Sequence, residues 1–114
     1  MIEKQVFIEN IKYTFIVGRD AHENTEIIKT AEPHDLWFHV SNYPSCHVIC
    51  KLQPIKYDKK LFRKIIKQGA ICCKQYCSYK NIDNLSIDYT YIKNVTLTDI
   101  PGSVNVINVK NIDI

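Results

Sequence analysis

The sequence predicts an α+β fold, in which a mainly antiparallel sheet carries one long amphipathic helix and a short helix packed on it. Three patterns predict this class. Apolar residues alternate with polar ones over residues 5–18, recur every three or four positions over residues 58–77, and alternate again after residue 85. At 114 residues the chain has room for one hydrophobic core, so we expect a single domain over residues 1–114.

The N-terminal segment QVFIENIKYTFIVG predicts two strands joined by a tight turn at Glu9-Asn10. Asn10 tolerates the left-handed conformation that such a turn needs. Glu9 tolerates it less well, so a longer loop is the alternative. One face of the second strand would be buried, because its apolar residues alternate: Tyr13, Phe15 and Val17.

A short helix is predicted after Gly18. Asp20 and Glu23 have the spacing of a capping box, which places the start of the helix at residue 21. Pro33 cannot continue a helix, so we expect this element to cover residues 21–30.

Residues 35–50, DLWFHVSNYPSCHVIC, predict two strands joined by a hairpin loop at SNYPS. Trp37 and His39 would share one face of the first strand, because successive side chains point to opposite faces. If Val40 pairs with Cys46, His39 lies opposite His47 on the same face as Trp37. Such a face, half aromatic and half titratable, is unusual for a plain core.

Residues 58–77 form the clearest predicted helix. Its apolar face follows the i, i+3, i+4, i+7 rule and comprises Phe62, Ile65, Ile66, Gly69, Cys73 and Tyr76. Its opposite side is basic and comprises Lys60, Arg63, Lys64, Lys67 and Lys74. These cations are either a nucleic-acid contact or an ordinary solvated surface. After the helix, LSIDYTYIKNV and SVNVINVKNIDI predict one strand each, the second at a sheet edge with Lys110 outward.

Charge is distributed unevenly along the chain. The net charge is +3, but residues 51–80 hold nine of the fifteen Lys and Arg residues and a single acidic residue, Asp58. This asymmetry indicates one basic surface on an otherwise balanced domain. No apolar run is long enough to span a bilayer or to form a signal peptide, so we expect no membrane partner. We also expect a cytoplasmic location, in which the five cysteines stay reduced.

The residue pattern gives little support to catalytic or metal chemistry. A zinc site needs three or four converging ligands, whereas His39 and His47 supply two, and Cys46 and Cys50 alternate to the opposite face. Cys46 also points away from His47, which argues against a Cys–His nucleophile pair. The three glycines are scattered and form no phosphate-binding loop. We therefore expect no enzyme activity, no metal and no cofactor; a metal-independent histidine nuclease using His39 and His47 is the enzymatic alternative.

Nucleic-acid binding fits the pattern better. Trp37 and the neighbouring tyrosines offer stacking surfaces, and Arg19 and Lys93 offer phosphate contacts. Trp37 is either such a stacking platform or an anchor of the core.

Four segments occur in the order and spacing of the NFACT-R family: VGRDAHEN (17–24), DLWFHV (35–40), SCHVI (45–49) and IDYTYIKNV (87–95). Over about residues 5–107 the chain resembles this RNA-binding domain, as found in the NEMF/Caliban and RqcH/FbpA proteins. The resemblance implies binding to ribosomal RNA or tRNA in ribosome-associated translation quality control. By motif position it singles out Arg19, Asn24, Asp35, Trp37, His39, His47, Tyr89 and Lys93.

Each of these residues has a physically reasonable role. Arg19 would bind a phosphate through its guanidinium fork, and Asn24 and Asp35 would fix the loop around it. His39 and His47 would hydrogen-bond phosphate or sugar, or hold the neighbouring tryptophan in place. The predicted nucleic-acid-binding set also includes the helix lysines Lys60, Lys64 and Lys67.

The chain departs from the family in its loops and in its extent. Ser45-Cys46 stands where Gly-Ser is usual, and TLTD (96–99) replaces a lysine-rich stretch. We expect a standalone domain without the family's N-terminal domain or coiled coil, so activities that depend on those parts are not carried over. The sequence thus predicts a non-enzymatic, single-domain RNA-binding protein. The alternatives are DNA as the partner, because phosphate contacts do not distinguish the two polymers, and a ribosomal or other protein recruited by an apolar edge strand.

Overall fold

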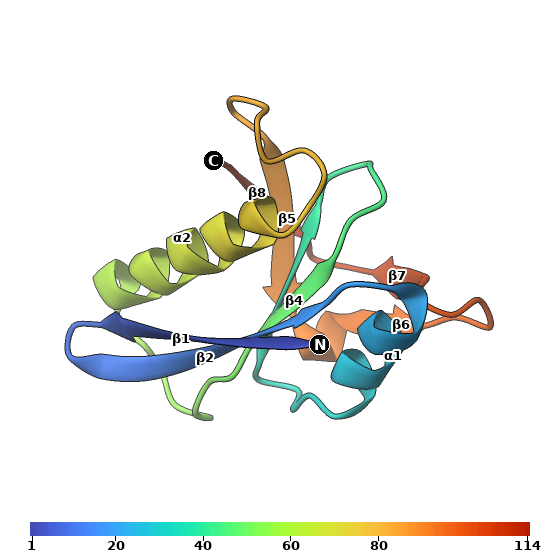
Figure 1. Ribbon diagram of the computed structural model, residues 1–114. Coiled ribbons are helices and arrows are strands. Elements are labelled where there is room, and N and C mark those ends of the chain that lie inside the picture. Colours follow the sequence, from blue (N-terminus) through green and yellow to red (C-terminus); the bar gives the residue numbers. More distant parts are fainter.

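A computed structural model describes residues 1–114 and contains eight strands, two α-helices and one 3-10 turn (Figure 1). The strands are β1 (Ile2–Ile8), β2 (Ile11–Gly18), β3 (Leu36–Val40), β4 (His47–Cys50), β5 (Ser86–Tyr91), β6 (Val95–Leu97), β7 (Val104–Val106) and β8 (Lys110–Asp113). The helices are α1 (Ala21–Lys29), α2 (Lys59–Gln75) and the 3-10 turn η1 (Ile92–Asn94). Six strands form an antiparallel sheet in the order β1-β2-β4-β3-β5-β8, and β6 pairs with β7 in a separate sheet. Neither α-helix is long and apolar enough to cross a membrane.

Strands β1 and β2 form the hairpin that the sequence predicts, with Ile8 opposite Ile11. Only Glu9 and Asn10 lie between them, and both are left-handed, with φ of 51° and 67°. Two consecutive left-handed residues give a turn whose twist matches that of the flanking strands. The tight turn is therefore confirmed, and the alternative of a longer loop is wrong.

Helix α1 begins after Asp20, whose Oδ1 accepts a hydrogen bond from the Glu23 backbone N–H at 2.8 Å. The Glu23 side chain in turn accepts a hydrogen bond from the Arg19 backbone N–H at 3.1 Å. The first contact satisfies an amide group that the start of a helix leaves unpaired, and the second ties the residue before the cap to the helix. The predicted helix over residues 21–30 is confirmed to within one residue.

The main core lies between α2 and one face of the larger sheet. Asp58 caps this helix by accepting a hydrogen bond from the Leu61 N–H at 3.0 Å. At the centre of the helix, Gly69 packs so closely on Phe38 that a Cβ atom would overlap the phenyl ring. This contact sets the distance between helix and sheet. The predicted helix is confirmed in position, and its buried residues are Ile65, Ile66, Gly69, Ala70, Cys72 and Cys73.

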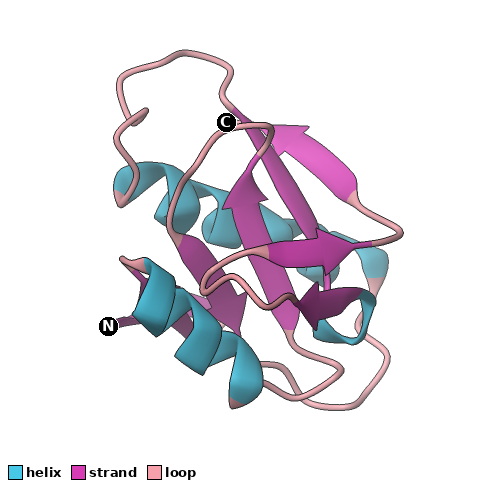
Figure 2. Ribbon diagram, turned by 90° about the vertical axis from the view of Figure 1, so that its right-hand side faces the viewer, coloured by secondary structure: helices cyan, strands magenta, loops and turns pink.

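The opposite face of the larger sheet carries a smaller core around Trp37. Trp37 is 2% exposed and packs with Ile27 and Ile28 of α1, Ile49 of β4 and Ile92 of η1. Partly buried side chains of β6 and β7 pack against the same cluster. The larger sheet therefore lies between α2 on one side and α1 with the β6–β7 pair on the other (Figure 1, Figure 2).

The predicted fold class is wrong in its arrangement. In place of a single sheet that carries a long and a short helix together, the structure has eight strands in two sheets, with helices of 17 and 9 residues on opposite faces of the larger one. Each of the two predicted C-terminal strands divides in two: η1 separates β5 from β6, and residues 107–109 separate β7 from β8. Asn108 turns the chain there with a φ of 54°. Apolar and polar residues keep alternating through both bends, because the strands before and after each bend bury one face each. The alternation therefore does not reveal where a strand ends.

Replacing Gly69 with alanine should destabilise the protein, although alanine favours helix formation by about 1 kcal/mol. The added methyl group would overlap the Phe38 ring. Forcing extra volume into a packed core costs about 1–3 kcal/mol, so chemical denaturation should show a lower free energy of unfolding. Lys67→Ala, at an exposed position of the same helix, is the control and should change this free energy by no more than about 0.5 kcal/mol. A Gly69→Ala protein that is more stable than the wild type would contradict the described packing.

Candidate nucleic-acid interface

Trp37, His39 and His47 form a cluster on the α1 side of the larger sheet. The register of β3 and β4 places Trp37 opposite Ile49 and therefore, two residues on, His39 opposite His47, as predicted. The ring centroids of the two histidines are 4.7 Å apart, and His39 stacks parallel to Trp37 at 5.7 Å. The Trp37 indole N–H donates a hydrogen bond to His47 Nδ1 at 3.1 Å.

Burial keeps His47 neutral. This residue is 2% exposed, and its pKa is lowered to about 3, chiefly by burial and further by the neighbouring His39. Because Nδ1 accepts the bond from Trp37, the single proton of the neutral ring is on Nε2. Nε2 has no hydrogen-bond partner within the chain, and no buried side-chain nitrogen or oxygen is left unpaired. The Nε2–H group therefore reaches solvent as a free donor.

His39 has the complementary tautomer. Its Nδ1 lies 2.6 Å from the Val40 carbonyl oxygen. Since a carbonyl oxygen only accepts, Nδ1 carries the proton and Nε2 is an acceptor. Burial lowers the pKa of His39 as well. At neutral pH the histidine pair thus presents one donor, His47 Nε2–H, and one acceptor, His39 Nε2, without a positive charge.

Asn24 joins α1 to this pair. Its Oδ1 accepts a hydrogen bond from the His47 backbone N–H at 3.2 Å, and the residue is buried. Gly18 faces His47 across the β2–β4 pairing, and a Cβ atom at Gly18 would overlap Asn24 Oδ1. The glycine before Arg19 is therefore required for the first turn of α1 to approach β4 this closely.

These groups line a polar pocket of about 440 Å³, which we name the Arg19 pocket. Its walls are the start of α1, the histidine pair and three loop segments, residues 44–46, 76–78 and 101–102. The Gly102 N–H donates a hydrogen bond to Thr25 Oγ1 at 2.8 Å and fixes one loop on α1. The predicted site residues include none from these three loop segments, although the hairpin loop itself was predicted. This contact, for example, joins residues 77 positions apart, and no local pattern reports it.

Arg19 is the cation of the pocket. Its side chain is 56% exposed, and Nε lies 3.6 Å from Glu23 Oε1. The N-terminal ammonium donates a hydrogen bond to Glu23 Oε2 at 2.7 Å, and this bond is the main cause of the lowered pKa of Glu23. The carboxylate holds Arg19 at the rim of the pocket and neutralises part of its charge. Because exposed ion pairs contribute little stability, the guanidinium can exchange this partner for a ligand.

Two of the predicted site residues are buried and do not line the Arg19 pocket. Trp37 is an anchor of the core, and the alternative of a stacking platform is wrong. Asp35 is fully buried, accepts a hydrogen bond from the Leu52 N–H at 2.9 Å and pairs with Lys51. It fixes the loops at the other end of β3, so its predicted place beside Arg19 is wrong.

Tyr89 and Lys93 lie outside the Arg19 pocket. They line a separate hollow at the opposite end of β3 and β5, and Tyr89 packs against Phe38 on the α2 side of the sheet. The structure therefore divides the residues that the family resemblance singled out into two groups, one at each end of β3.

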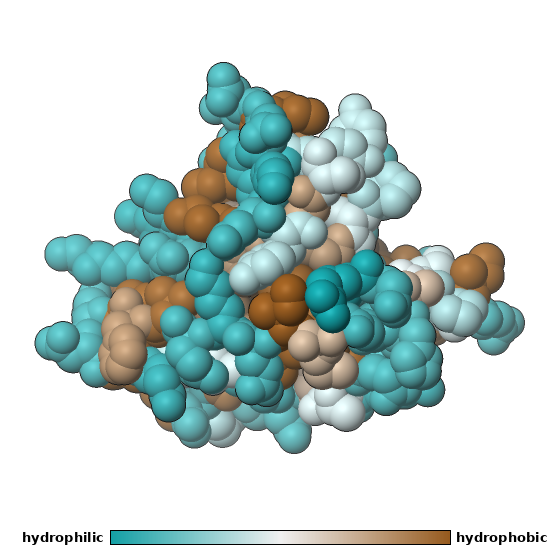
Figure 3. Space-filling model, viewed as in Figure 1, coloured by the Kyte–Doolittle hydropathy of each residue, from teal (hydrophilic) through white to brown (hydrophobic).

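The predicted helix lysines form a third group on the outer side of α2. Lys60, Lys64 and Lys67 are exposed, and Figure 3 shows mainly hydrophilic side chains over this side of the molecule. Lys64 pairs with Glu9 of the β1–β2 turn at 2.9 Å. None of the three lysines lines the Arg19 pocket, so a role for them in nucleic-acid binding stays a prediction.

The five cysteines are free and buried. Burial raises the pKa of the Cys50 and Cys72 thiols, and the hydrogen bond between the Cys46 and Cys73 side chains raises the pKa of Cys73 and lowers that of Cys46. A neutral buried thiol is a poor nucleophile. The structure places no three or more His, Cys, Asp or Glu side chains where they could hold a metal ion.

Comparison of the sequence with known families finds a match to the family described as NFACT protein RNA binding domain over residues 4–107. Coiled-coil domain-containing protein 25 of Mus musculus is 27% identical over 97 residues, which are 82% of this chain and 47% of that protein. The Danio rerio protein of the same name is 31% identical over 75% of this chain and 42% of its own length. Protein JLP2 of Saccharomyces cerevisiae is 33% identical over 61% of this chain and 33% of its own length. The chain thus spans less than half the length of these relatives.

Among solved structures, the C-terminal part of the fibronectin/fibrinogen-binding protein from Streptococcus suis has the same fold. The TM-score is 0.81 over 98% of this chain and 44% of that chain, at 18% sequence identity. An identity this low speaks for the fold alone.

The protein should lose stability as the pH falls from about 7.5 to 5, because of His47. The unfolded chain binds a proton at this residue near its ordinary pKa of 6.5, whereas the folded protein does not until about pH 3. Below pH 6.5 the unfolded state therefore holds more protons, and each further pH unit lowers the free energy of unfolding by up to about 1.4 kcal/mol for this residue. Urea titrations at several pH values should show this slope, and His47→Gln should reduce it.

The matched control is His22→Gln, which changes an exposed histidine of α1. Its pH dependence should equal that of the wild type. If His47→Gln left the slope unchanged, His47 would have to be protonated in the folded protein, and the neutral pair described above would be wrong.

Proposed function

Because this chain belongs to the NFACT protein RNA binding domain family, we propose that it binds RNA at the Arg19 pocket and catalyses no reaction. The observation that carries the proposal is the donor and acceptor pair of His47 Nε2–H and His39 Nε2. A ribose 2′-hydroxyl both donates and accepts hydrogen bonds, and it is the group that distinguishes RNA from DNA. The histidine pair is complementary to it.

Arg19 supplies the phosphate contact beside this pair. Its guanidinium matches a phosphate in a forked geometry, and the N-terminal end of α1 favours negative charge at the same pocket. Glu23 competes for Arg19, so binding exchanges one exposed ion pair for another. A phosphate at Arg19 and a ribose at the histidines would together hold one nucleotide by its backbone.

The same histidines support a non-enzymatic role. A general base works best when its pKa lies near the operating pH. His47, with a pKa of about 3, is too weak a base at neutral pH. Burial also lowers the pKa of His39. This argues against the histidine nuclease that the sequence left as an alternative.

We further propose that the RNA is ribosomal RNA or tRNA, and that the protein acts in the cytoplasm in translation quality control. The support is the resemblance of the four sequence motifs to proteins with that role. The curated relatives are more than twice as long as the matched part, so their complete activities are not transferred to this chain.

Purified protein should bind single-stranded RNA with an affinity that falls as salt rises. If about four phosphates are neutralised, the logarithm of affinity against that of salt should have a slope of about −3. The matching DNA oligonucleotide should bind more weakly, because it lacks the 2′-hydroxyl. Fluorescence anisotropy between about 50 and 200 mM salt measures both effects. Equal affinity for RNA and DNA would contradict the proposed contact with the ribose 2′-hydroxyl. If the protein bound no RNA at low salt, binding of a protein partner at an edge strand would be the better function.

Arg19→Ala should weaken RNA binding by removing a single contact, the one with a phosphate. The salt slope should shrink by about 1, as expected for the loss of one phosphate contact. The melting temperature should change little, because the exposed pair with Glu23 contributes little stability. Anisotropy and thermal melts on the same preparation test this, and unchanged affinity would contradict the proposed site.

The comparison variant replaces Lys60, Lys64 and Lys67 together by alanine. All three side chains are exposed, so the fold should remain intact. If the outer side of α2 also follows the RNA, affinity should fall for every RNA sequence and the slope should shrink by about 2, because three of the four phosphate contacts are lost. If this variant binds RNA as tightly as the wild type while Arg19→Ala binds more weakly, the interface is restricted to the Arg19 pocket.

A further inference from the structure

Three adjoining hollows run along the end of the sheet at which β5 and η1 meet. Their volumes are about 250, 400 and 310 Å³. The middle hollow shares Tyr91 and Lys93 with the first and shares Tyr57 with the third. None of their lining residues belongs to the Arg19 pocket. We name this surface the tyrosine track, after Tyr13, Tyr57, Tyr89 and Tyr91.

The charge of the tyrosine track has one sign. Lys12, Lys93 and Lys110 line it and take part in no ion pair, whereas Lys51 is neutralised by Asp35. No Asp or Glu side chain lines any of the three hollows. An uncompensated cationic surface of this kind attracts an anionic chain.

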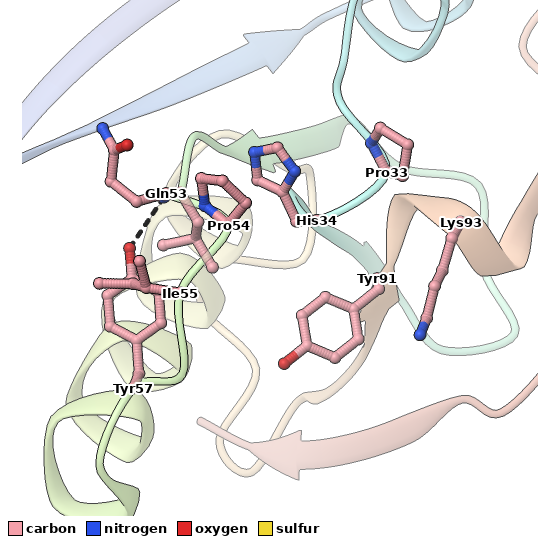
Figure 4. A pocket seen from close by; sticks show the side chains of 9 residues that line it. Pro33, His34, Gln53, Pro54, Ile55, Tyr57, Tyr91 and Lys93 are labelled. Carbon is pink, nitrogen blue, oxygen red and sulfur yellow. Dashed lines mark hydrogen bonds between the residues drawn. The ribbon is translucent and has the colours of Figure 1, made fainter.

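Tyr91 lies between the first and the middle hollow and offers an aromatic surface. Figure 4 shows its ring pointing into the middle hollow, with Lys93 beside it and His34 and Pro54 across from it. Tyr91 is 37% exposed, and Lys93 Nζ lies over its ring, 5.6 Å from the centroid. Phe62 of α2 supports it at a centroid distance of 6.1 Å. A cation next to an exposed aromatic ring is the pairing that single-stranded nucleic-acid sites use.

The walls of the middle hollow are held by backbone hydrogen bonds. The Lys93 N–H donates to the Pro33 carbonyl oxygen at 3.1 Å, and the Ile92 N–H donates to that of Asp35 at 2.9 Å. On the facing wall, the Gln53 N–H donates to the Tyr57 hydroxyl at 2.9 Å. The hollow therefore exists before a ligand arrives, and little ordering of the chain opposes binding.

From these observations we infer that the tyrosine track binds unpaired nucleotides of single-stranded RNA, with a base stacked on Tyr91 and a phosphate at Lys93. This inference rests on the proposed RNA binding but concerns a second surface. Bases in a duplex are stacked on each other and cannot enter the hollows, whereas splayed bases stack readily on tyrosine. A proline-rich peptide also lies on tyrosines, but the unbalanced positive charge favours the polyanion.

The test uses single-stranded RNA that carries 2-aminopurine, a fluorescent adenine analogue whose emission changes when it stacks. Wild-type protein should change the emission and should bind this RNA more tightly than a fully paired duplex. Tyr91→Ala should abolish the emission change and weaken binding by about 5- to 150-fold, the range for loss of one stacked base. Tyr91→Phe keeps the ring and should bind as the wild type does. Lys93→Ala should reduce the salt slope by about 1.

Tyr43→Ala is the control, because Tyr43 is a 56% exposed tyrosine that lines neither the tyrosine track nor the Arg19 pocket. If the wild type binds no RNA, the proposed function itself fails. If Tyr91→Ala and Lys93→Ala both bind like the wild type while Arg19→Ala does not, RNA binding stands and the inference about the track is overturned. The inference would also be overturned if a proline-rich peptide displaced the 2-aminopurine RNA and the protein bound single-stranded RNA no more tightly than duplex.

Discussion

Strand β3 is buried on both faces, and the rest of the structure depends on this constraint. Phe38 packs against Gly69 of α2, and its neighbour Trp37 packs against α1. Successive side chains of a strand point to opposite faces, so a slip of one residue would exchange the two aromatic rings. The exchange would bring the larger indole ring against Gly69, which already touches the phenyl ring of Phe38. The register of β3 with β4 is therefore fixed, and with it the approach of His39 to His47.

The chemistry of the histidine pair follows from this burial. The bond from Trp37 occupies His47 Nδ1, and burial removes the proton that an exposed imidazole would gain near pH 6.5. The side chain that stabilises the smaller core thus also selects the tautomer that faces the Arg19 pocket. One hydrogen bond thus links core packing to the proposed ligand recognition, so a change at Trp37 would affect both.

Local patterns in the sequence predict the features that depend on neighbouring residues. The Glu9-Asn10 turn, both helices and the His39–His47 register follow from turn chemistry and from periods of two and of three to four residues. The bends at η1 and Asn108 were missed, because alternation persists on both sides of them. Alternation places Trp37 on a face but does not reveal what covers that face. The loops that complete the Arg19 pocket, and the joining of the three hollows into the tyrosine track, were missed because they bring distant segments together.

The Arg19 pocket and the tyrosine track are connected through β3. His39 lies near one end of this strand and Asp35, which holds the loops of the track, precedes the other. With about 3.3 Å per residue, the four steps between them span about 13 Å. β3 is paired on both sides, so this spacing is rigid. Neither surface is built to contact base edges: the proposed contacts are phosphate, ribose and the flat faces of bases. Since base edges carry the sequence information, such a protein would select unpaired RNA by its shape and sugar and would tolerate many sequences.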